Sequence, residues 1–142
     1  MHNALWVNDI LVISGVEQLA RVEKRRDSQT LVVTYPVVDG DIPVVEQVLQ
    51  RLHDDEAPWD WHLLFDLSAF EGYETFAQLE SFASGWRHLL AGNGDGRRIA
   101  VASADPLIAA RFRTGCYQTL FRGHDCALFE TPAEAARWIA SN

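Results

Sequence analysis

The chain has 142 residues, of which 48% are apolar and 23% are charged, so it suits one folded domain with a sizeable core and excludes a largely disordered protein. Its formal net charge of −8 argues against bulk attraction to nucleic acid or to anionic lipid. Its apolar runs fall far short of about 18 residues, and two cysteines are too few for a disulfide framework. We therefore expect a cytoplasmic protein that has no membrane span and binds no nucleic acid.

Three short runs of apolar or β-branched residues in the first part of the chain predict strands. They lie at residues 10–13, at about residues 19–23, and at residues 30–35. A helix is expected over residues 41–52, because apolar side chains recur there at intervals of three and four.

From about residue 60 onward, strand signals and helix signals alternate. Residues 61–67 form a nearly continuous apolar run that predicts a buried central strand, and further strands are expected at residues 99–102 and 126–129. This alternation predicts an α/β sheet with parallel strand pairs and crossover helices. The earlier strands could pair as a hairpin at one side, which would make the sheet mixed.

Three helices are predicted between and after these strands. The first begins at Thr75, which can form a capping box with Gln78. The last begins at Thr131, followed by a proline at the first helical position and a glutamate at the third. The middle one is expected as a single helix that starts at Asp105 and aligns three side chains along one side: Ile108, Phe112 and Cys116.

Three segments carry a resemblance to a known family. Leu64–Tyr73, with the sequence LFDLSAFEGY, is similar to the strand, Asp and Phe-Glu-Gly-aromatic segment of SpoIIAA-like proteins. Arg98–Val101 resembles the strand that follows the long helix in that family, and Ala135–Ile139 resembles its C-terminal Ala-x-x-Trp-aliphatic helix. The resemblance is good from residue 61 onward and looser before it.

The resemblance implies the fold that this family shares with STAS domains (sulfate transporter and anti-sigma factor antagonist). That fold has a mixed β-sheet with crossover helices packed mainly on one face. Residues 1–17 are then expected to be an N-terminal extension with a strand of its own, and residues 18–142 to be the SpoIIAA-like domain. The resemblance implies a fold, but it implies little about function, because the biochemical role of the family is mostly unassigned.

Thr75 is one candidate functional residue. In STAS regulators a phosphorylated Ser or Thr sits at a helix start after a strand that ends in Asp-Leu-Ser, and here Asp66-Leu67-Ser68 ends a predicted strand. A phosphate on Thr75 would gain from the helix dipole. The usual Asp-Ser-Ser/Thr-Gly is absent, however, so an ordinary N-cap is the simpler interpretation.

The loop around Thr75 is the candidate surface for a ligand or a partner. It follows the carboxyl end of a strand, where α/β sheets tend to bind ligands. Asp66 could also act with a loop carboxylate in acid–base chemistry, although the sequence places no His, Cys or Lys near them. The candidate residues of this loop are Ser68, Phe70, Glu71, Tyr73 and Thr75.

A second candidate site is an apolar groove beneath the helix that follows Thr75. If this helix moved outward, a groove for a lipid-like molecule would open, as the resemblance implies. Plain packing of an amphipathic helix is the competing interpretation. The groove would be lined by Phe76, Leu79, Phe82 and Trp86.

The sequence gives no reason to expect a metal or another cofactor. The five histidines and two cysteines show neither His-x-x-x-His nor Cys-x-x-Cys spacing. We therefore expect a non-enzymatic regulatory or partner-binding STAS-like module. The alternatives are a carrier or sensor of a small apolar ligand, and an enzyme that uses the Asp66–Thr75 loop.

Overall fold

The computed structural model describes residues 4–13, 21–35, 60–70, 75–90, 92–93 and 96–141, with the backbone alone at 4–7 and 11–13. The predicted helix at 41–52 and the candidate residues Glu71 and Tyr73 lie outside these ranges. No helix within the described ranges is long and apolar enough to cross a membrane.

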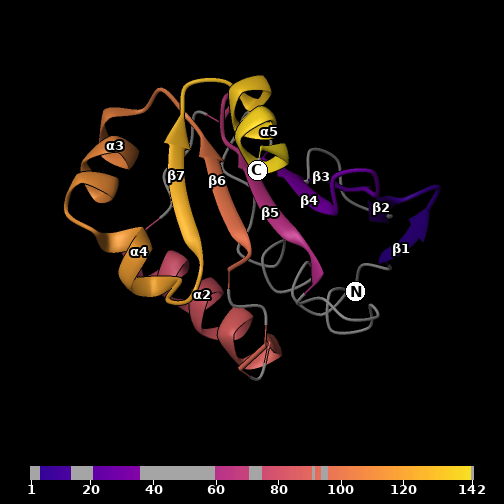
Figure 1. The fold of residues 1–142 in the computed structure, drawn as a ribbon, viewed down its shortest axis with the longest axis horizontal. Helices are drawn as coiled ribbons and strands as arrows, with labels where there is room; N and C mark the ends of the chain where they lie inside the picture. Colours follow the sequence, from indigo (N-terminus) through magenta and orange to yellow (C-terminus); the bar gives the residue numbers. More distant parts are fainter. Residues whose placement is uncertain are drawn as a thin grey trace.

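One mixed sheet organises the described residues, and its strands lie in the order in which they occur along the chain (Figure 1). Neighbouring strands are antiparallel from β1 to β4 and parallel from β4 to β7. The prediction of an α/β protein with a mixed sheet is confirmed. The strands are β1 (Ala4–Val7), β2 (Ile10–Ile13), β3 (Arg21–Arg25), β4 (Thr30–Thr34), β5 (His62–Asp66), β6 (Arg98–Ala102) and β7 (Asp125–Phe129).

Four described helices cover the two faces of this sheet. They are α2 (Phe76–Leu90), α3 (Pro106–Arg113), α4 (Cys116–Leu120) and α5 (Pro132–Ala140). The larger core packs α2, α3 and α4 against one face, and a smaller core packs α5 against the other. The crossovers through α2 and through α3–α4 lie on the same face of the sheet. Because crossovers between parallel strands share one handedness, both add the next strand on the same side of the previous one.

The central strands are apolar because both of their faces are buried. On β5, Leu63 and Phe65 face the larger core and Leu64 faces the smaller one, and each is at most 6% exposed. The neighbouring strand β4 shows the same alternation through Leu31 and Val32. The continuous apolar run around residue 64 therefore reflects a parallel strand covered on both sides, as its pattern predicted.

The prediction of a single helix from Asp105 to Cys116 is wrong. The chain forms two helices, α3 and α4, separated by Gly115, whose φ of +77° lies in the left-handed region. A continuous right-handed helix cannot include such a residue. Gly115 therefore turns the chain, and α4 places Tyr117 and Leu120 into the larger core.

The N-terminal strands form a hairpin that continues the sheet. Asn8 and Asp9 connect β1 to β2 with φ values of +49° and +65°, as expected for a two-residue turn of type I′. Asp9 also receives two hydrogen bonds from the Arg26 guanidinium, at 2.7 and 2.9 Å, and its carbonyl accepts from the Lys24 N–H at 2.7 Å. The hairpin is thus joined to the β3–β4 turn, while the domain boundary at residue 17 stays a prediction.

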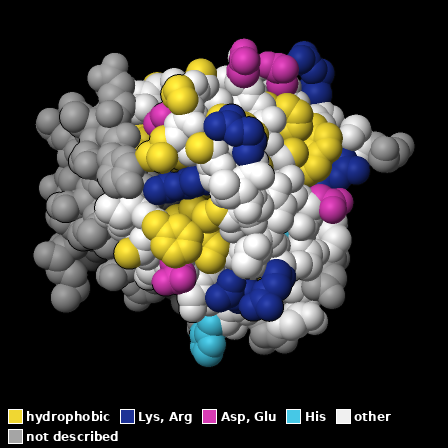
Figure 2. Space-filling view, turned by 90° about the vertical axis from the view of Figure 1, so that its left-hand side faces the viewer, with side chains coloured by type: hydrophobic (Ala, Val, Ile, Leu, Met, Phe, Trp, Pro, Cys, Tyr) yellow, Lys and Arg dark blue, Asp and Glu magenta, His cyan; other side chains and the backbone are white. Residues whose placement is uncertain are grey.

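The second predicted strand is displaced by two residues, since β3 spans Arg21–Arg25 and so includes the basic residues Arg21, Lys24 and Arg25. At the other end of the described sheet, β7 is bracketed by the exposed acidic residues Asp125 and Glu130. Figure 2 views the side of the molecule that carries α3, α4 and β7, where cationic and acidic side chains interrupt the apolar ones. Charges at a sheet edge disfavour pairing with a further strand.

Candidate functional site

The parallel strands β4 to β7 end at one edge of the sheet, which we call the carboxyl edge. α/β proteins usually place their binding sites at such an edge. Parallel pairing extends beyond the strands here, because the Tyr35 N–H donates to the Asp66 carbonyl at 2.9 Å. One residue from each strand end lies at this edge: Tyr35, Asp66, Ser103 and Glu130.

Asp66 and Ser68 organise the loop that leaves β5. Asp66 Oδ1 accepts a hydrogen bond from the Ser68 N–H at 3.0 Å and another from the Ser68 hydroxyl at 2.5 Å. The Phe70 N–H then donates to the Leu67 carbonyl at 3.1 Å. This is an Asx turn, a local use of a carboxylate that stabilises the backbone. The hydrogen-bonding capacity of Asp66 Oδ1 is therefore used within the turn, by Ser68. Beyond the turn, Phe70 packs edge-on against Tyr35 with ring centroids 5.3 Å apart.

Thr75 starts α2 with the predicted capping box. The Thr75 hydroxyl accepts from the Gln78 N–H at 3.1 Å, and the Gln78 amide oxygen accepts from the Thr75 N–H at 2.7 Å. These bonds satisfy two backbone N–H groups that a helix start otherwise leaves unpaired. Thr75 itself is exposed. Its phosphorylation stays a prediction.

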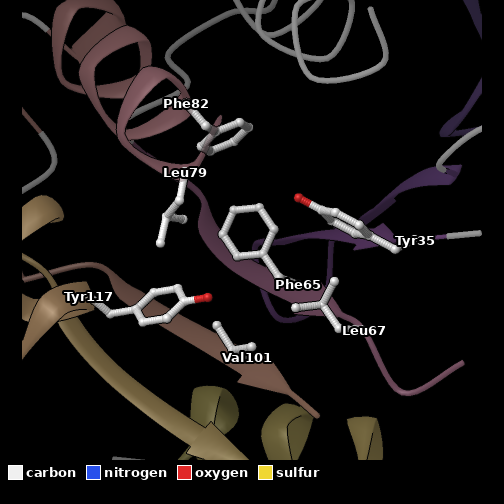
Figure 3. A pocket seen from close by; sticks show the side chains of 7 residues that line it. All are labelled: Tyr35, Phe65, Leu67, Leu79, Phe82, Val101 and Tyr117. Carbon is white, nitrogen blue, oxygen red and sulfur yellow. The ribbon is translucent and has the colours of Figure 1, made fainter. Parts of the chain in front are cut away.

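A small apolar cavity lies beneath the carboxyl edge, between the sheet and α2 (Figure 3). Its volume is about 10 Å³, which is room for about one water molecule. The rings of Tyr35 and Tyr117 enter from opposite sides, and both hydroxyls point inward (Figure 3). The lining residues are Tyr35, Phe65, Leu67, Leu79, Phe82, Val101 and Tyr117.

The structure brings together two of the four residues predicted to line an apolar groove. Leu79 and Phe82 line the cavity, whereas Phe76 and Trp86 do not. Phe76 occupies the first turn of α2 and is 50% exposed, and Trp86 is fully buried nearer the other end. In the described residues α2 packs onto the sheet beyond its first turn. The groove, which would open only if this helix moved outward, stays a prediction.

Sequence reasoning missed two features of this region. Tyr35 ends a predicted strand and Tyr117 directly follows the predicted helix, yet both side chains line the cavity with their hydroxyls pointing inward (Figure 3). At the opposite, amino edge of the parallel strands, His62 and His124 approach Arg97 and Trp86. Nothing in the local sequence signals these contacts, because they depend on the order of the strands.

Both cysteines are free and half-buried. Burial, and then the neighbouring Asp125 carboxylate, raise the pKa of Cys126 to about 12, and burial also raises the pKa of Cys116. Both groups therefore remain thiols at neutral pH, which disfavours a nucleophilic role. Among the described residues, no three His, Cys, Asp or Glu side chains are grouped so that they could hold a metal ion.

Comparisons with protein-family models, with curated proteins and with solved structures find no match to this chain. The SpoIIAA-like resemblance is thus a prediction from the sequence alone.

Proposed function

We propose that the chain is a regulatory or partner-binding module of the SpoIIAA-like, STAS-related kind, rather than an enzyme. Its docking surface would be the connection between β5 and α2. The observation that carries the proposal is Phe76, which is 50% exposed although it begins a helix that is otherwise well packed. An exposed aromatic ring loses little conformational entropy when a partner covers it, and such residues are enriched at protein interfaces.

The described parts of this connection are held in place by local hydrogen bonds. The Asx turn at Asp66–Ser68 and the capping box at Thr75–Gln78 order its two ends. Pre-organisation of this kind reduces the entropy that is lost on binding. An exposed hydroxyl on Thr75 lies next to Phe76, so a single surface offers an apolar anchor and a polar contact.

The same contacts favour this proposal over an enzyme. Three described polar side chains near the carboxyl edge act as caps; the first two are Asp66, which closes a turn, and Asp105, whose Oδ1 accepts from the Leu107 N–H at 2.9 Å. Ser103 Oγ accepts from the Asp105 N–H at 3.0 Å. General acid–base catalysis requires a side chain directed at a substrate, and these groups are directed at the backbone.

The apolar-ligand alternative has less support from the described residues. The cavity of about 10 Å³ at Leu79 and Phe82 is far below the several hundred Å³ of an ordinary ligand pocket. A lipid-like ligand would require α2 to move away from the sheet.

The proposal can be tested by quantitative affinity capture with the full chain from cells in which it is native. Phe76→Ala removes the exposed ring, and Thr75→Asp adds a negative charge while keeping a good N-cap. We expect each variant to lose about tenfold or more of a captured protein, as is typical when an interface anchor is removed. Leu107→Ala is the matched control, since Leu107 is 39% exposed in the first turn of α3.

The proposal is wrong if capture by the two variants equals that of the unmodified chain. It is equally wrong if Leu107→Ala loses the partner to the same extent, because the contact would then not be specific to the β5–α2 connection.

A further inference from the structure

Two histidines lie at the amino edge of the parallel strands, opposite the proposed docking surface. His62 opens β5 and His124 directly precedes β7, and both are half-buried. The Arg98 backbone N–H donates to His62 Nδ1 at 2.8 Å. The indole N–H of Trp86 donates to His124 Nε2 at 3.2 Å. Each histidine thus uses one ring nitrogen as a hydrogen-bond acceptor.

These hydrogen bonds specify one neutral tautomer for each ring. His62 Nδ1 must be unprotonated to accept from Arg98, so its proton resides on Nε2. His124 Nε2 must be unprotonated to accept from Trp86, so its proton is on Nδ1, which lies 3.1 Å from the Arg97 carbonyl and donates to it. A second proton on either ring would turn its accepting nitrogen into an N–H donor that faces the N–H donor of its present partner.

The surrounding charges also oppose protonation. Burial is the main cause that lowers the pKa of His62, followed by the positive charges of Arg97 and Arg98 and by the charge that His124 carries when it is protonated. Of the nearby carboxylates, Asp60 is 3.9 Å from Arg97, and the exposed Asp125 follows His124 in the chain.

The other neighbouring charges come from elements packed around this edge. From the β3–β4 turn, Arg26 lies over the Trp61 ring at 6.0 Å and is paired with Asp9. From α2, Arg87 donates to the Leu120 carbonyl, and His88 is exposed. The cationic groups outnumber the carboxylates among these residues, so the edge as a whole disfavours an additional positive charge.

Trp86 connects this edge to α2. Its ring is fully buried, and its indole bond to His124 joins α2 to the segment before β7. The preceding turns of the same helix supply Leu79 and Phe82 to the cavity. Loss of the bond would therefore weaken the packing of the helix that closes the larger core.

We propose that His62 and His124 form a proton-sensitive latch at the amino edge. While both rings are neutral, His124 holds α2 through Trp86 and His62 holds β6 through the Arg98 N–H, and mildly acidic conditions loosen both contacts. This inference does not depend on the proposed partner-binding role. Its consequence would be that acid exposes apolar surface beneath α2.

The direction of the pH dependence follows from linkage. A histidine whose pKa is lowered in the folded state stabilises the fold above its unfolded pKa of about 6.5, and the stabilisation is lost as the pH falls below that value. Each ring that stays neutral in the fold raises the unfolding equilibrium constant by about tenfold between pH 7.5 and pH 5.5.

The test is urea unfolding of the full chain from pH 5.5 to pH 7.5, together with amide hydrogen exchange. His62→Gln and His124→Gln retain a hydrogen-bond acceptor but cannot be protonated. We expect the double variant to lose most of the pH dependence, and His88→Gln, the exposed control, to retain it. In the unmodified chain, protection of the amides from Trp86 to Leu90 should fall toward pH 5.5 more than protection in α5.

A direct titration of the two rings by nuclear magnetic resonance covers the case in which the double variant does not fold. We expect both pKa values below about 6.5, with the proton on Nε2 of His62 and on Nδ1 of His124. The latch is refuted if either ring has the opposite tautomer or titrates at or above that value. It is also refuted if the double variant retains the full pH response.

Discussion

Arg98 shows how much a single side chain can organise in this fold. It projects from β6 to the C-terminal end of α5, where its guanidinium donates to the carbonyls of Trp138 and Ser141, the latter at 2.7 Å. It also lies over the Trp138 ring, 5.1 Å from its centroid. The last carbonyls of a helix lack partners within it and attract a positive charge. Arg98 meets both needs for the helix that covers the smaller core.

We expect Arg98→Met to lower the free energy of unfolding by about 1–3 kcal/mol, because the part-buried Trp138 carbonyl and the Ser141 carbonyl lose a charged donor. Arg137→Met provides the control in the exposed part of the same helix, and its effect should stay within about 0.5 kcal/mol. Urea denaturation of both variants would measure the difference. Equal effects would mean that Arg98 is not a cap for α5.

At the scale of elements, the division between α3 and α4 shows how one backbone conformation redirects a segment. Gly115 has a φ of +77°, and a side chain added there would meet no atom within 4 Å. Any penalty for substitution must therefore come from the backbone rather than from crowding. After this turn, α4 directs Tyr117 toward Phe112, with stacked rings 4.3 Å apart.

Gly115→Ala should destabilise the protein by about 1–2 kcal/mol, because an L-residue is strained in the left-handed region. Gly115→Asn should cost less than half as much, since asparagine tolerates this conformation. Thermal or urea unfolding of the pair provides the measurement. If alanine is tolerated as well as asparagine, the left-handed turn is not required for stability.

At the scale of the whole molecule, the sheet continues without a break from the N-terminal hairpin to β7. The hairpin adds to the edge of β3, and Asp9 and Arg26 join the two turns. The hydrogen bonds from Arg26 are the main reason that the pKa of Asp9 is lowered. The ionised form of Asp9 therefore favours the docked hairpin.

We expect Asp9→Asn to loosen the hairpin while leaving the rest of the fold intact. Asparagine fits the positive φ of the turn, so the change removes the charge and little else. Amide hydrogen exchange at neutral pH should be faster in residues 4–13 and unchanged in α5.

The unmodified chain should show the same loosening in acid. A carboxylate with a lowered folded pKa stabilises the fold above its unfolded pKa of about 3.9, and the contribution is lost as the pH falls through the lower folded value. Unaltered exchange in Asp9→Asn would show that backbone pairing alone holds the hairpin.

Local patterns in the chain were sufficient to predict most of the described strands and the helix starts. The capping box at Thr75 and the N-cap at Thr131 involve partners three residues away, so a short segment specifies both. The alternation after residue 60 was likewise enough for an α/β sheet with parallel pairs. The break at Gly115 escaped prediction because the apolar spacing continues across it.

The assembled fold decided which residues meet. Trp86 and His124 are 38 positions apart, and His62 is 36 positions from Arg98, so both contacts arise only after β5, β6 and β7 have paired. Tyr35 and Tyr117 line the same cavity for the same reason, because only the assembled fold brings both side chains to it. The exposure of Phe76 was decided in the same way: periodicity assigns a side chain to a helix face, but the extent of the sheet beneath determines whether that face is covered.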